Sequence, residues 1–219
     1  MFLMYSKSRD GGASWSTATT IVPSSDGRSA WGPVLTCAAE PDETGAEVQK
    51  LALFYAFSRN STDAFSNPGG DLYSIVSYDD GETWTEEPRL IMSQEDSAMG
   101  AENPLYFVNQ AIETDTHYLI PYGSTSDGYP SSSGAASLLS LEKGPRALEE
   151  GTWETIARTF EIPYGEAGTP MSSILEPALA KITQGSEDKG CVMYFRSATN
   201  HLWNTRTSDP TCLAGWQEP

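Results

Sequence analysis

The sequence predicts an all-β protein built from a repeated unit, and three observations indicate this class. An eight-residue pattern, S-x-D-x-G-x-x-W, occurs at residues 8–15 and again at residues 77–84. Tryptophans at positions 15, 84, 153 and 216 recur at intervals of 69, 69 and 63 residues. Short apolar runs bounded by Gly, Asn, Asp, Ser and Pro lie between them, and no long stretch shows the 3.6-residue periodicity of a helix.

The expected strands lie on both sides of each repeat. They cover Leu51–Phe57, Leu72–Ser77, Tyr118–Tyr122, Ala135–Leu141, Val192–Arg196 and Leu202–Thr207. An apolar residue precedes the Ser or Thr of each copy by five positions, at Leu3, Leu72, Ala135 and Leu202. Between positions 142 and 154 the chain is acidic but contains Gly and Pro, which argues against a long helix there.

The repeated motif has a mechanical interpretation. Its Asp can accept hydrogen bonds from the N–H groups of a turn, its Gly supplies a positive φ, and its Trp covers the hairpin. Two further copies are weaker, one ending at Trp153 and one at Trp216. We therefore assign a structural role to the motif residues Ser8, Asp10, Gly12, Trp15, Ser77, Asp79, Gly81, Trp84, Asp209 and Trp216.

The motif is identified as an Asp-box, or BNR, repeat, and its arrangement over nearly the whole chain resembles the sialidase superfamily, especially the BNR-repeat-like branch. That resemblance implies a six-bladed β-propeller of which three to four blades are present. A closed propeller usually needs at least four blades. We therefore expect residues 1–219 to form one incomplete sialidase-like domain, truncated at both ends, with unpaired strand edges that favour association.

The resemblance also implies a site. In sialidases a Glu on a blade strand precedes a substrate-binding Arg, and an Asp-box hairpin follows; here Glu176 precedes Arg196 by 20 residues, and the copy ending at Trp216 follows. Arg196 would bind the carboxylate of a sialic acid through two charge-assisted hydrogen bonds. Glu176 would be catalytic, activating a tyrosine nucleophile.

Alignment of the repeats places Arg196 opposite Phe57, so a charge that needs a partner replaces an aromatic ring. The alternative is that Arg196 is a rim residue or pairs with a nearby carboxylate, and that Glu176 is a solvated strand end. Weaker pocket candidates contain prolines that equally suit strand starts. They are Trp31–Pro33, Glu102–Leu105 and Pro121–Tyr122.

The leading hypothesis is a retaining exo-α-sialidase that removes terminal sialic acid from glycoconjugates. The family's acid/base Asp, its other arginines and its Tyr nucleophile cannot be assigned within this chain, so the fragment alone is expected to be inactive. A second hypothesis is a non-catalytic Asp-box propeller that binds carbohydrate or protein, because the repeat specifies architecture and not activity. A third is a different glycosidase with paired carboxylates on the same scaffold.

Composition excludes several other classes. A formal net charge of −17, with no basic cluster, disfavours nucleic acid as a partner, and no apolar run approaches the length of a membrane span. Three cysteines and two histidines lack metal-ligand spacing, so neither metal nor cofactor is expected. Cys191 and Cys212 flank a hairpin and either pair or remain free. The sequon Asn60–Thr62 leaves the compartment open, with secretion or a lumen the preferred reading.

Overall fold

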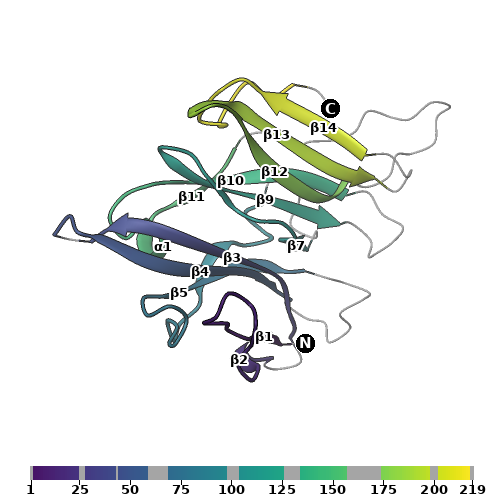
Figure 1. The fold of residues 1–219 in the computed structure, drawn as a ribbon. Coiled ribbons are helices and arrows are strands. Elements are labelled where there is room, and N and C mark those ends of the chain that lie inside the picture. Colours follow the sequence, from purple (N-terminus) through teal and green to yellow (C-terminus); the bar gives the residue numbers. More distant parts are fainter. Residues whose placement is uncertain are drawn as a thin grey trace.

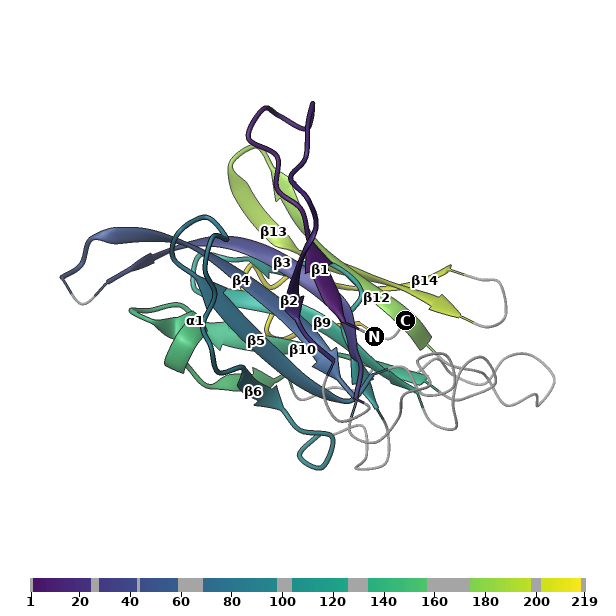
Figure 2. The ribbon, with the colours of Figure 1, turned by 90° about the horizontal axis from the view of Figure 1, so that it is seen from below.

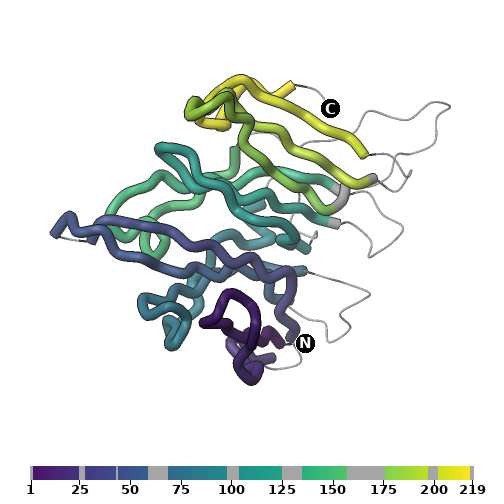
Figure 3. The backbone as a smooth tube through the Cα atoms, viewed as in Figure 1, coloured from purple at the N-terminus to yellow at the C-terminus, as the bar shows by residue number. Residues whose placement is uncertain are grey.

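A computed structural model of the 219-residue chain describes residues 2–24, 28–42, 44–58, 69–97, 104–125, 134–156, 174–197 and 202–217. These residues form four antiparallel sheets that follow one another in chain order, from β1–β2 near the N-terminus to β12–β14 near the C-terminus (Figure 1). The backbone trace runs through the stack of sheets in the same order (Figure 3). The predicted all-β class is confirmed.

The first sheet pairs β1 (Leu3–Tyr5) with β2 (Thr19–Val22). The second sheet has the order β3 (Ala30–Pro41), β4 (Glu47–Phe57), β5 (Asp71–Ser77) and β6 (Arg89–Met92), and these strands lie side by side in Figure 2. The third has the order β11 (Trp153–Thr155), β10 (Gly134–Glu142), β9 (His117–Thr125) and β7 (Leu105–Tyr106), with β8 (Ile112–Glu113) also on β9. The fourth has the order β12 (Ile174–Gln184), β13 (Glu187–Ser197) and β14 (Leu202–Thr207).

All six expected strands are present, and β14 has the expected bounds. The long inner strands β3 and β12 were not predicted, because each contains a proline that reads as a turn signal. One short helix, α1 (Ala147–Glu150), lies in the acidic segment, directly after Pro145 and Arg146. The prediction that no long helix forms there is therefore confirmed.

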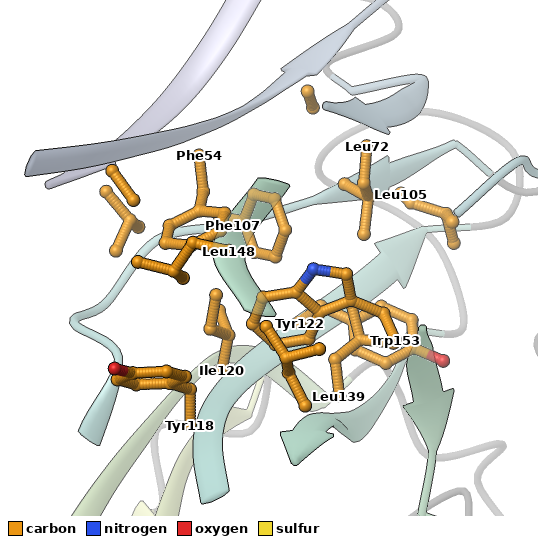
Figure 4. Packing of buried hydrophobic residues seen from close by; sticks show 14 of the residues in the cluster. Phe54, Leu72, Leu105, Phe107, Tyr118, Ile120, Tyr122, Leu139, Leu148 and Trp153 are labelled. Atoms are coloured by element: carbon orange, nitrogen blue, oxygen red, sulfur yellow. The ribbon is translucent and has the colours of Figure 1, made fainter. Parts of the chain in front are cut away.

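Apolar side chains are buried between successive sheets. The largest cluster joins the second sheet to the third: Phe54 meets Trp153 edge to face at 5.5 Å, and Tyr122 and Ile120 are fully buried nearby (Figure 4). A second cluster joins the third sheet to the fourth, and a third cluster lies between the first and second sheets. Packing of successive sheets face against face is the arrangement expected of propeller blades.

The motif tryptophans contribute to this packing. Trp84 meets Tyr5 of the preceding sheet at 6.3 Å, and Trp153 meets Phe54 of its own preceding sheet. Trp216 is buried and donates from its indole N–H to the carbonyl of Cys212. Trp15 differs, because 64% of its surface is exposed. Each of the other tryptophans thus ties its hairpin to neighbouring structure.

Two covalent and ionic features strengthen the core. Cys191 and Cys212 form a fully buried disulfide that ties β13 to the last Asp-box turn, so the open question about these cysteines is resolved in favour of pairing. Lys50 is buried and contacts the carboxylates of both Glu40 and Glu149 at 2.8 Å. The backbone N–H of Leu148 donates to Glu40, so this ionic cluster joins the second sheet to α1.

Candidate functional site

Glu176 lies in a β-bulge near the start of β12. Leu175 pairs with Arg196 and Ala178 pairs with Tyr194, which leaves Glu176 and Pro177 opposite a single residue of β13. The bulge gives Glu176 a φ of 54°, in the left-handed region. A residue with a Cβ in that region costs about 1–2 kcal/mol, and such strain concentrates at functional sites.

The equivalent bulge in β3 shows what this position normally requires. Trp31 pairs with Ala56 and Val34 with Phe54, so Gly32 and its following proline correspond to the glutamate and proline of β12. Gly32 has a φ of 55°, and a Cβ on it would lie 2.0 Å from the carbonyl oxygen of Phe107. The β12 bulge therefore carries a glutamate where the β3 bulge carries a glycine.

The guanidinium of Arg196 meets the Glu176 carboxylate, with 3.1 Å between Nε and Oε2. Their side chains are 45% and 42% exposed, so the pair lies at the rim and both groups are accessible to a ligand. An ion pair this exposed contributes only about 0–1 kcal/mol to stability. The contact therefore does not account for the strained backbone of Glu176. The geometry also agrees with the alternative in which Arg196 is a rim residue that pairs with a nearby carboxylate.

The register corrects the alignment of Arg196 with Phe57. In the second, third and fourth sheets the Ser or Thr of the repeat pairs with Leu51, Leu119 and Cys191 respectively. The residues five positions after Leu51, Leu119 and Cys191 are therefore equivalent; they are Ala56, Ser124 and Arg196. The first two are buried and small, so the arginine replaces a small side chain, and Phe57 lies one residue beyond the position equivalent to Arg196.

The Asp-box turns lie at the other end of the blades from this pair. Arg196 is near the end of β13, and the last box follows β14, which runs antiparallel to β13. In the second box, Asp79 accepts hydrogen bonds from the N–H and hydroxyl of Thr83 at 2.8 and 2.6 Å, while Gly81 N–H donates to Ser77 Oγ. The hydrogen bonds from Thr83 lower the pKa of Asp79 to about 2.

The first and last boxes use the same interactions. In the first box Asp10 accepts from the N–H and hydroxyl of Ser14, Ser8 Oγ accepts from Gly12 N–H, and the pKa of Asp10 is likewise about 2. Burial raises the pKa of Asp209, but hydrogen bonds from Thr211 and from backbone N–H groups outweigh it and lower the pKa. The aspartates are thus occupied by their turns.

The weaker pocket candidates have structural roles where they are described. Tyr122 is fully buried in the largest apolar cluster, and Pro121 is paired with Leu138 inside β9. Trp31 and Gly32 lie at the bulge of β3 described above. Glu102 and Asn103 fall outside the described residues, as does the sequon at positions 60–62.

A separate hollow of about 340 Å³ lies between β2, β4 and β5. Its aromatic walls pack on one another: Tyr55 and Tyr73 stack at 6.0 Å, and Phe57 meets Tyr73 edge to face. Arg28 at its wall lies over the Phe57 ring and donates from Nε to the carbonyl of Ser58 at 2.7 Å. Because these groups are engaged with one another, this hollow is a weaker candidate than the Glu176–Arg196 pair.

Two residues near the pair had no signal in the sequence. Asn109, in the connection between β7 and β8, donates from Nδ2 to the carbonyl oxygen of Pro177 at 2.9 Å and approaches that of Glu176 at 3.4 Å. Tyr106 in β7 has a buried hydroxyl with no hydrogen-bond partner among the described residues. Burial raises the pKa of Tyr106 to about 12, so it remains a neutral phenol.

Comparison with protein-family models matches residues 2–219 to the BNR repeat-like domain. The chain belongs to the BNR repeat-like family. This match confirms the resemblance inferred from the Asp boxes and, together with the successive antiparallel sheets, the propeller type of fold. A search among curated proteins finds no match.

In the described part of the chain, no helix is long and apolar enough to cross a bilayer. Among those same residues, no three His, Cys, Asp or Glu side chains gather as a metal site would require.

Proposed function

We propose that this BNR-repeat protein is an exo-α-sialidase in which Glu176 and Arg196 form part of the site for a terminal sialic acid. The observation that carries the proposal is the glutamate in a left-handed bulge, where the equivalent bulge of β3 has a glycine, with its carboxylate on an arginine. Strain of this kind persists where function requires a particular side chain. The exposure of both groups gives a ligand access to them.

The chemistry of the pair suits this substrate. A guanidinium presents parallel N–H donors that match a carboxylate, so Arg196 would bind the sugar's carboxylate in place of, or together with, Glu176. Glu176, released from or sharing the arginine, would act as the base that activates a tyrosine nucleophile, as the family resemblance implies.

A fluorogenic sialoside tests this proposal directly. The assay uses the protein encoded by the full reading frame, because the fragment alone is expected to be inactive. We expect that protein to hydrolyse the sialoside, and Glu176→Gln to lower kcat because the amide cannot act as a base. Arg196→Ala should raise KM about 10- to 100-fold, the equivalent of losing a charged hydrogen-bonded pair. Matched controls are Glu187→Gln and Arg206→Ala, which alter exposed charges elsewhere on the same sheet. Activity unchanged in both site variants would refute the assignment.

One observation favours a second candidate, a non-catalytic module that binds sialylated glycans. Tyr106, the tyrosine just before the connection that holds the bulge, is buried, so its hydroxyl is not exposed to a sugar as a nucleophile would have to be. In this case the protein would bind sialic acid through Arg196 and release it unchanged. Binding without hydrolysis in the assay above would select this candidate.

A further inference from the structure

The connection between β7 and β8 lies between the bulges of two neighbouring sheets. The carbonyl of Phe107 fits against Gly32 in the β3 bulge, where no Cβ can be accommodated. Two residues further on, Asn109 donates to the β12 bulge at Pro177. This connection therefore touches both the position where the repeat uses glycine and the position where it uses glutamate.

Asn109 provides a specific restraint on the bulge of β12. Its amide donates to the carbonyl of Pro177 at 2.9 Å and lies 3.4 Å from the carbonyl oxygen of Glu176. One side chain therefore contacts both residues that lie opposite a single residue of β13 in the bulge. Because Glu176 adopts a φ that disfavours any residue with a Cβ, an external restraint is needed to hold it. Asn109 is placed to supply that restraint.

Tyr106, three residues before Asn109, packs within the third sheet. A Cβ on Gly123, its partner on β9, would lie 2.7 Å from both Cζ and the hydroxyl oxygen of Tyr106, so the ring occupies the space that the glycine leaves. Its hydroxyl is buried and has no partner of normal geometry in the structure. A buried hydroxyl left unpaired costs free energy, and replacing it by hydrogen would remove that cost.

We propose that Asn109 is a positioning residue of the glycan site, holding the left-handed Glu176 bulge so that its carboxylate faces Arg196. Its side chain need not touch the sugar. The inference rests on the proposed function of the Glu176–Arg196 pair. The restraint comes from the third sheet and the Glu176 bulge belongs to the fourth, so the site is assembled only where these two sheets meet.

Kinetics on the fluorogenic sialoside test the positioning role. We expect Asn109→Ala to lower kcat/KM about tenfold, the value of one hydrogen bond to a strained backbone, and Asn109→Asp to lower it at least as much because a carboxylate cannot donate. Tyr106→Phe removes a hydroxyl that has no partner in the described part of the chain, so it should leave kcat/KM unchanged and the unfolding midpoint unchanged or higher. It serves as one control, and Asn204→Ala on β14 as another; both should match the wild-type kinetics. Wild-type kinetics in both Asn109 variants would overturn the proposal.

A double-mutant cycle tests the restraint even if the protein hydrolyses nothing. Glycine adopts a φ of 54° without strain, so Glu176→Gly should remove the need for Asn109. We expect Asn109→Ala to lower the thermal midpoint by about 2–4 °C in the wild type and by much less in the Glu176→Gly background. Equal shifts in the two backgrounds would refute the restraint. Coupling without any turnover or sialic-acid binding would refute the proposed function and leave the restraint established.

Discussion

The disulfide between Cys191 and Cys212 is expected to supply a measurable share of the stability of the fourth sheet. The two cysteines are 21 residues apart and fully buried, and they tie β13 to the Asp-box turn that follows β14. The chain-entropy model gives about 3 kcal/mol for closing a loop of this length. For a chain of this size that corresponds to a fall in the thermal midpoint of about 6–12 °C.

Replacing both cysteines by serine is the perturbation, and thermal or urea unfolding with and without reductant is the assay. Reductant should lower the midpoint of the wild type to that of the Cys191→Ser/Cys212→Ser variant and should leave that variant unaffected. The matched control is Cys37→Ser, because Cys37 is exposed and unpaired. A loss below about 1 kcal/mol, or an equal effect of reductant on the double variant, would refute the reasoning.

Three further predictions concern the ionic cluster, the Asp boxes and the bulge of β3. Lys50→Met leaves two buried carboxylates without their cation and should cost about 3–5 kcal/mol in urea unfolding; the wild-type urea midpoint would contradict this. The pKa of Asp79 is about 2 in the folded chain against 3.8 for the ordinary group, so its contribution to stability is present above pH 4 and is lost as pH falls towards 2. Asp79→Asn should therefore flatten the fall of the unfolding midpoint over that pH range, and an unchanged pH profile would contradict the role of the box. Gly32→Ala should destabilise by at least about 2 kcal/mol, because it combines a positive φ with a clash against neighbouring backbone; a midpoint within 1 °C of the wild type would contradict it.

The repeat allowed much of the fold to be predicted from sequence. Residues that are local to a motif were assigned well: the strand Leu202–Thr207 has the predicted bounds, and Asp79 bonds its own turn four residues away. Short-range hydrogen bonds are written into consecutive residues, so a motif reveals them. The inner strands β3 and β12 were missed because a bulge and a proline interrupt their apolar pattern.

The interactions that define the site are less visible in sequence. The 20-residue spacing and the family resemblance identified Glu176 and Arg196 as a candidate pair. The left-handed backbone of Glu176, which matches that of Gly32 in the equivalent bulge, could be seen only in the structure. Asn109 reaches the bulge across 68 residues of chain, and the amide of Leu148 reaches Glu40 across 108. No periodicity encodes such contacts, because they depend on how one blade is rotated against the next.

The pairing of Cys191 with Cys212 was left open for a related reason. Their spacing fits a link across a hairpin, but a free buried thiol has the same sequence signature. The register of β13 with β14, and the burial of both sulfurs in the cluster between the third and fourth sheets, decide between them. A buried disulfide is typical of proteins that fold in an oxidising compartment.

Binding of N-acetylneuraminic acid compared with its methyl ester tests the central claim most directly, because the ester differs only in lacking the carboxylate charge. Titration calorimetry of the wild type should show binding of the acid and at least about tenfold weaker binding of the ester, and Arg196→Ala should bind acid and ester equally weakly. Equal affinity of the wild type for both sugars, or retention of the preference by Arg196→Ala, would contradict the assignment of this pair as the sialic-acid site.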